Sequence, residues 1–263
     1  MQFVDFEYDG QTLSSWGYIV CIFDQSDGVD VIESGDAISF EKTPVQNGVV
    51  FELTNTKHEE CITSTFDICK DPDVFDDLII SDHEYRKLSR WLNRKEFFRF
   101  KPLDDELENC FYDASFNVNK IKIADKLVGL ELKMETNRPF GYNHISYKFS
   151  LDSNTTKTIY DESDEIGYLY PKMKIEILED GDLTLNNSFD NSNMTIRNCK
   201  KDEVITINYP VICSNFSEHR IQNDFDWKFL RISNTYDNRI NTISSTIACN
   251  IRLAYDPIVK VGI

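Results

Sequence analysis

Short runs in which apolar and polar residues alternate recur along most of the chain, separated by turn-forming residues. The segments KMKIEIL (172–178) and LTLNN (183–187) are typical, and they flank EDGD (179–182), where Gly181 can supply the positive φ of a tight turn. A period of two residues places one face of a strand in a core and the other face in water. The pattern therefore predicts a chain that folds mainly as antiparallel strands.

The alternation predicts strands almost everywhere outside one segment. In the first half, the predicted strands cover residues 3–8, 15–23, 37–42, 49–55, 61–70, 97–102, 110–118, 120–124, 127–136 and 145–151. In the second half, MTIRNC, EVITINYPVIC, DWKFLRIS and NIRLAYDPIV continue the series without a further helix. Many short strands at this spacing are typical of an antiparallel sandwich.

The length of the chain indicates more than one domain. At 263 residues it is near the size at which a single hydrophobic core divides. The polar segment 152–157 is the predicted linker. We therefore predict two domains: residues 1–151, which are β-rich with one helix, and residues 152–263, which form an antiparallel β-sandwich.

One segment, within SDHEYRKLSRWLNRKEFFRF (81–100), has the helical period instead, with Arg94 and Lys95 in its last turn before the predicted strand 97–102. Ser81 and Glu84 match the S-x-x-E capping box, which satisfies two backbone donors at a helix start. Apolar side chains follow at helical spacing and are predicted to pack the helix on a sheet. They are Tyr85, Leu88, Trp91 and Leu92.

Charge is distributed unevenly along the sequence, whose formal net charge is −17. Residues 1–85 contain 3 Lys/Arg and 19 Asp/Glu, whereas residues 86–101 contain 7 Lys/Arg and one Glu. A strongly acidic chain repels phosphate backbones and anionic lipid, so binding to nucleic acid and insertion into a membrane are not expected. No apolar run approaches the roughly 20 residues of a membrane span.

The basic helix has two explanations. Packing of its apolar face on a sheet, with the cations in water, accounts for the pattern by itself. Alternatively, Arg86, Arg90 and Arg94 dock on an acidic face of a neighbouring copy, where opposite charges would guide assembly and set its register.

Signatures of catalysis, cofactor binding and metal binding are absent from the sequence. Asp24–Asp30 resembles the start of a calcium loop, but Gly35 stands where the closing Glu should be. The four histidines have no ligand-spaced partner, and the seven cysteines form no C-x-x-C pair. No G-x-S-x-G and no Gly-rich phosphate loop occurs. We expect no enzyme, cofactor or metal site, and synthesis in a reducing cytoplasm because the N-terminus lacks a secretory signal.

Four motifs, in this order and spacing, resemble the N-terminal belt domain of siphophage distal tail proteins (Dit-like proteins). They are SSWG (14–17), Trp91-Leu92 at the end of the helix, the Phe-rich FFRFK (97–101) and TNRPFGY (136–142). The second half is similar to the galectin-like β-sandwich of that family, with Pro171 before a strand and Tyr255-Asp256-Pro257 near the end. The sugar site of galectins is not carried over, because Trp227 lacks the expected polar set around it.

The resemblance implies a structural virion protein in the tail of a long-tailed phage, made in the cytoplasm of its bacterial host. Members of the family form a homo-hexameric ring that joins the tail tube protein to the tail tip or baseplate. Their partners are therefore further copies of the chain, the tail tube protein, tail-tip and tape-measure-associated proteins, and receptor-binding proteins.

Two other functions stay open on the sequence. A carbohydrate-binding adhesin would present exposed aromatic side chains in a groove. A cell-wall glycan hydrolase would hold a carboxylate such as Asp161 or Glu165 in a cleft, although these residues lie in a polar segment typical of a solvated loop.

Overall fold

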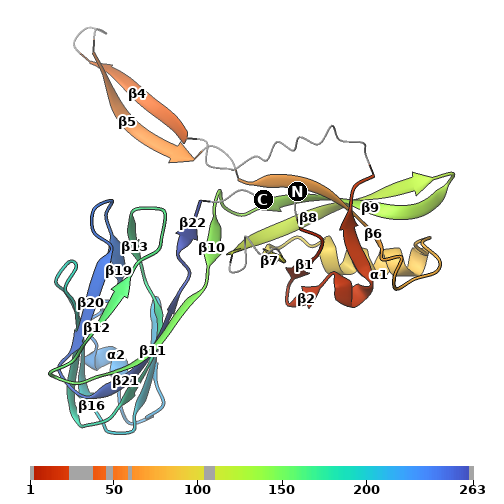
Figure 1. Cartoon of the computed structure of the whole chain (residues 1–263). Helices are drawn as coiled ribbons and strands as arrows, with labels where there is room; N and C mark the ends of the chain where they lie inside the picture. The colour runs from red at the N-terminus through yellow and green to blue at the C-terminus, as the bar shows by residue number, and fades with distance from the viewer. Residues whose placement is uncertain (1–2, 24–37, 46–49, 59–60, 104–109, 261–263) are drawn as a thin grey trace. The chain divides into compact units, whose positions relative to one another are not determined.

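The structure is a computed structural model, and it describes residues 3–23, 38–45, 50–58, 61–103 and 110–260. It consists mostly of antiparallel strands with few helices (Figure 1), which confirms the predicted fold class. The chain divides into two compact units, Met1–Tyr142 with Val259–Ile263, and Asn143–Ile258.

The first unit is built on one large sheet with the strand order β2-β1-β7-β8-β9-β6-β3. Strand β10 (Gly141–Asn143) pairs with β8 and with β22 (Ile258–Val259), and β4 and β5 form a separate hairpin. Its other elements are β1 (Phe6–Tyr8), β2 (Gln11–Thr12), the 3-10 turn η1 (Ser14–Trp16), β3 (Tyr18–Cys21), β4 (Ile38–Val45), β5 (Val50–His58), β6 (Thr63–Lys70), α1 (Asp82–Leu92), β7 (Phe98–Pro102), β8 (Cys110–Ile123) and β9 (Lys126–Thr136).

An aromatic cluster fills the core of the first unit. Phe6, Tyr8, Phe100 and Phe116 are almost completely buried, and Tyr8 packs edge-on against Phe116 with ring centroids 4.9 Å apart. Burial of each such side chain contributes roughly 1.5–3 kcal/mol. The Phe-rich strands of the sequence therefore meet on one face of the sheet.

The second unit is a two-layer sandwich. One sheet has the order β11-β21-β14-β17-β18 and the other β12-β20-β15-β16, with β13 and β19 as an extra pair. The elements are β11 (Ile145–Leu151), β12 (Thr156–Tyr160), β13 (Gly167–Leu169), β14 (Lys172–Ile177), β15 (Gly181–Asn187), β16 (Ser192–Cys199), β17 (Val204–Asn208), β18 (Val211–Ser214), α2 (Ile221–Asp224), β19 (Ile232–Asn234), β20 (Ile240–Ser245) and β21 (Cys249–Tyr255).

Alternation decides which side chains enter the sandwich core. Ile175 on β14, Ile205 on β17 and Ile251 on β21 point inward from one sheet, and Leu185 on β15 and Ile243 on β20 from the other. All five are at most 1% exposed. The apolar–polar alternation seen in the sequence is the cause of this two-sided arrangement.

The observed division differs from the predicted boundary at residue 151. Strand β11 pairs with β21 along its whole length, so it belongs to the second unit. The predicted linker 152–157 contains a turn, closed by the Thr155 N–H bonded to the Asp152 carbonyl at 3.4 Å, and the start of β12. A polar turn between two strands looks the same in sequence as a linker between domains.

Several elements differ in detail from those predicted. The two strands predicted at 110–118 and 120–124 form one continuous strand, β8. EVITINYPVIC forms two strands, β17 and β18, because the turn at Tyr209-Pro210 interrupts it. The short helix α2 was not predicted, and DWKFLRIS contributes only β19.

Candidate functional site

Helix α1 is fixed on the sheet of the first unit at both ends of its apolar face (Figure 1). Leu88, Trp91 and Leu92 are buried, and Tyr85 is partly buried against the same core. The indole Nε1 of Trp91 donates to the carbonyl of Tyr8 at 3.1 Å, which ties the last turn to β1.

The start of α1 is tied to the sheet by an ion pair. Ser81 and Glu84 form the predicted capping box, in which the Ser81 N–H donates to a Glu84 oxygen at 2.7 Å and Ser81 Oγ accepts from the Glu84 N–H at 3.3 Å. Glu84 also bonds the buried ammonium of Lys70 on β6 at 2.9 Å. The carboxylate of Glu84 therefore caps the start of α1 and anchors it to β6.

The three arginines predicted for a copy-to-copy contact do not behave alike. Arg94 donates to Asp9 at 2.7 Å and to the Trp91 carbonyl at 2.8 Å, and it lies over the Phe98 ring. Arg86 and Arg90 are exposed, and within the described part of the chain neither has an ion pair. Two of the three cations are therefore free on the surface, and one is engaged within its own chain.

The hairpin β4–β5 exposes apolar side chains. Ile38, Phe40 and Leu53 are 45%, 58% and 55% exposed, and most of the hairpin's residues are exposed. Two-stranded hairpins on their own are only marginally stable in water. This hairpin therefore lacks the buried face that stabilises the other strands.

The second unit carries a partly exposed row of aromatic rings in contact with one another. Tyr170 stacks on Tyr209 at 4.2 Å with ring planes 7° apart, and Tyr209 packs edge-on against Phe229 at 5.0 Å. Tyr168 and Tyr209 are 55% and 51% exposed, and Arg231 lies over the Tyr168 ring. Tyr and Arg on an exposed surface are the residue types that dominate binding energy at protein interfaces.

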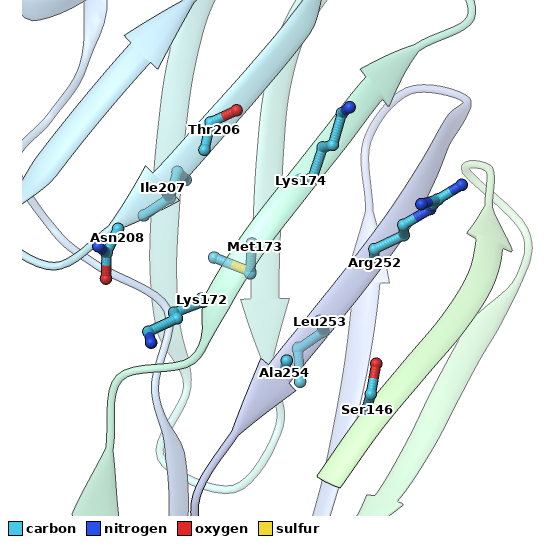
Figure 2. Close-up of a pocket in the computed structure, with 10 residues that line it drawn as sticks. All are labelled: Ser146, Lys172, Met173, Lys174, Thr206, Ile207, Asn208, Arg252, Leu253 and Ala254. Carbon is cyan, nitrogen blue, oxygen red and sulfur yellow. The ribbon is translucent and has the colours of Figure 1, made fainter. Parts of the chain in front are cut away.

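The outer face of the five-stranded sheet carries two shallow grooves of about 340 and 460 Å³. Lys174 on β14 and Arg252 on β21 line both of them, and Figure 2 shows these two side chains on neighbouring strands. Lys172, Thr206 and Asn208 also line the first groove.

A third groove of about 510 Å³ lies beside α2, around His219. The Nδ1 atom of His219 lies 2.6 Å from the buried carboxylate of Glu203, and its Nε2 atom lies 3.4 Å from Asp224. Glu203 also accepts hydrogen bonds from the Ser214 hydroxyl and from the Lys200 N–H. These contacts hold loops of the sandwich together.

Of the two carboxylates considered for hydrolysis, that of Asp161 has a structural partner. Asn234 donates its amide to Asp161, which is 2% exposed, and to the backbone carbonyl of Glu165 at 3.0 Å. Neither Asp161 nor Glu165 lines any of the three grooves described above. Asp104, Asp105 and Glu106, a second cluster of carboxylates in a polar segment of the sequence, lie outside the described residues, as does the calcium-like segment Asp24–Asp30.

Among the residues that the structure describes, no group of three or more His, Cys, Asp or Glu side chains is placed to hold a metal ion. All seven cysteines are free thiols. In the same part of the chain, no helix is long and apolar enough to cross a membrane.

The row of contacting aromatic rings and the cationic sheet face were not predicted from the sequence. Alternation already placed Lys172 and Lys174 on one face of a strand. It could not bring Arg252 beside them, because β21 lies far along the chain and becomes a neighbour of β14 only through sheet pairing.

Two family models together match nearly all of the sequence. A family model described as "Phage tail protein N-terminal domain" matches residues 1–138, and one described as "Phage tail C-terminal domain" matches residues 140–255. A search of curated proteins finds no match.

Among solved structures, the chain is similar to the Dit protein of SPP1, described as a paradigm of the hub adsorption apparatus in phages that infect Gram-positive bacteria. The TM-score is 0.64 at 9% sequence identity, over 97% of this chain and 99% of that chain. At this identity the likeness shows a shared fold. Together the two family models cover almost all of the sequence, and the chain belongs to the phage tail protein family that they define.

Proposed function

We propose that this phage tail protein is a distal tail hub, which assembles into a homo-hexameric ring and joins the tail tube to the tail-tip and receptor-binding proteins. It acts by binding, without turnover. The observation that carries the proposal is the shared fold with the SPP1 Dit protein over 97% of the chain, both units included.

The hairpin β4–β5 supports contacts between copies. Its exposed Phe40 and Leu53 would be buried only against another surface, and that burial would also stabilise a hairpin that is marginal alone. If the hairpin of each copy packs on a different patch of the next copy, the contact is head-to-tail, and such contacts close into a ring when the rotation between copies permits.

Charge supports the same contact. Arg86 and Arg90 on α1 are exposed without an ion pair among the described residues, in a chain whose residues 1–85 are strongly acidic. Opposite patches on successive copies would speed association and fix its register. Arg94 would contribute by holding the end of α1 through Asp9.

The test is the solution mass measured by light scattering. We expect six copies of the 30.6 kDa chain in each particle, either for the protein alone or, once the mass of the bound partner is subtracted, in complex with the tail tube protein. The double variants Phe40→Ser/Leu53→Ser and Arg86→Glu/Arg90→Glu should both weaken assembly. Raised salt should weaken assembly of the wild type as the charge reversal Arg86→Glu/Arg90→Glu does, because it screens the same charges.

The control is Lys200→Glu/Lys201→Glu, which makes the same charge change on the second unit. The triple reversal that adds Arg94→Glu tests the full predicted set. Assembly of the triple variant at wild-type strength would rule out a role for the helix, and a protein that stays monomeric with its tail partners would rule out the ring.

The partly exposed aromatic rings around Tyr209 favour this part of the second unit as a docking site for a tail-tip partner. A carbohydrate-binding role would use the same rings. Binding on a glycan array that is lost in Tyr209→Ala would favour that second role.

A further inference from the structure

The outer face of the five-stranded sheet in the second unit carries a row of positive charges. Lys148 on β11 lies in register with Arg252 on β21, and Arg252 lies in register with Lys174 on β14. Because neighbouring strands are about 4.8 Å apart, the backbone positions of the three cations span only about 10 Å. Lys172 projects from the same face of β14, two residues before Lys174 (Figure 2).

None of these four cations is in direct contact with a charged or hydrogen-bonding partner among the described residues of the chain. All four are exposed, and none has a hydrogen bond or an ion pair there. Like charges placed directly opposite each other lower the stability of a sheet. Folding stability therefore gives no reason for the row, whereas an anionic ligand would.

The positive charge is local, because it opposes the charge of the surrounding unit. Residues 143–258 contain 12 Lys/Arg and 17 Asp/Glu in total. This face carries four cations but a single carboxylate, that of Glu176, which accepts a hydrogen bond from the Asn250 amide at 3.0 Å.

The rest of the face indicates what kind of anion fits. Large apolar and aromatic side chains, which anchor most protein interfaces, are absent from its exposed positions on β11, β21 and β14. The remaining groups there and on β17 are mostly small or polar, and include Ser146, Ser150, Thr206 and Asn208. Hydroxyl and amide groups beside unpaired cations suit a hydrophilic polyanion better than a folded protein.

We propose that this face binds a linear phosphodiester polymer, with its phosphates on the row of Lys148, Arg252 and Lys174. The planar fork of Arg252 can bond two phosphate oxygens, and the flanking lysines supply point charges. The two grooves share Lys174 and Arg252 and extend along the sheet on both sides of them, which leaves room for successive repeats. This activity is separate from ring assembly and does not depend on it.

Binding of the full-length protein to poly(glycerol phosphate) of defined length, measured by isothermal titration calorimetry at low salt, tests the proposal. We expect binding that weakens as salt is raised. Lys174→Gln/Arg252→Gln should lower the affinity about tenfold, while Lys200→Gln/Lys201→Gln removes the same charge elsewhere and should change it little. Glu176→Gln should raise the affinity about twofold, and Asp237→Asn, in an exposed turn, should not.

Parallel titrations use a neutral dextran, a polygalacturonate and a single-stranded oligonucleotide. No binding to the phosphate polymer, or equal loss in the two double variants, would overturn the proposal. Tighter binding of the polygalacturonate or the oligonucleotide would assign the face to a different polyanion and would also overturn it. Circular dichroism and light scattering on every variant separate loss of this site from misfolding and from a failure of the ring.

Discussion

At the scale of single residues, the buried carboxylate of Glu203 has an unusual concentration of partners. It is 0% exposed and bonds the Ser214 hydroxyl, the Lys200 N–H and the imidazole of His219. These partners come from β18 and from the turns on either side of β17 and β18. One side chain therefore joins the end of β18 to the turn before β17 and to the turn after β18.

Truncation of this side chain should destabilise the second unit. We expect Glu203→Ala to lower the free energy of unfolding by about 2–4 kcal/mol, because three donors lose their acceptor in a buried site. Chemical denaturation monitored by circular dichroism measures this value. Glu218→Ala, an exposed neighbour, is the matched control and should stay within about 0.5 kcal/mol of wild type. Equal effects of the two substitutions would contradict the role given to Glu203.

At the scale of elements, helix α1 depends on the ionised form of Glu84. Burial raises the pKa of Glu84, but the hydrogen bonds from Lys70 and Ser81 and the charge of Lys70 together lower it to about 2, from 4.5. A carboxyl group whose pKa is lower in the folded state stabilises the fold above its unfolded value. This contribution is fully present above pH 4.5 and is lost as the pH falls through about 2.

The substitution Glu84→Gln should therefore destabilise the first unit most at neutral pH, and its difference from wild type should shrink between pH 4.5 and pH 2. Urea denaturation at several pH values follows this difference. Asp82→Asn, which alters a neighbouring first-turn carboxylate outside the capping box, is the control. A difference between Glu84→Gln and wild type that does not depend on pH would show that the ion pair with Lys70 contributes nothing.

Some elements could be predicted from the sequence alone and others could not. The start of helix α1 at Ser81 was predicted, because the capping box and the apolar spacing depend on residues close together in the chain. Most strands were predicted for the same reason. The helix ends at Leu92, before the end of the predicted segment 81–100, and the last residues of that segment begin β7. Strand β12 was not predicted, because its start was assigned to the predicted linker 152–157. Asp152–Thr155 is polar, and polarity alone does not distinguish a turn from a linker.

At the scale of the whole molecule, the two units have separate hydrophobic cores. Leu132 lies in the core of the first unit and Leu185 in that of the second, and both are 0% exposed. Since each unit buries its own apolar surface, each should unfold as its own cooperative unit.

Calorimetry of the wild type should then resolve two transitions. Leu185→Ala should lower the unfolding temperature of the second unit only, and Leu132→Ala that of the first unit only. Each substitution should lower the free energy of unfolding of its own unit by about 2–5 kcal/mol. The two variants serve as controls for each other. A single transition that both substitutions lower together would show that the units unfold as one.

The sequence by itself determined the fold class, the helix and its cap, and the existence of a sandwich, because these depend on periodicity and on residues close in the chain. It also carried the resemblance to phage tail proteins, which the family models confirm. Only the tertiary structure decided the division at Tyr142, the engagement of Arg94 with Asp9, and the row of Lys148, Arg252 and Lys174. Each of these depends on which distant strands become neighbours, and that choice is made by long-range pairing and packing that no local pattern encodes.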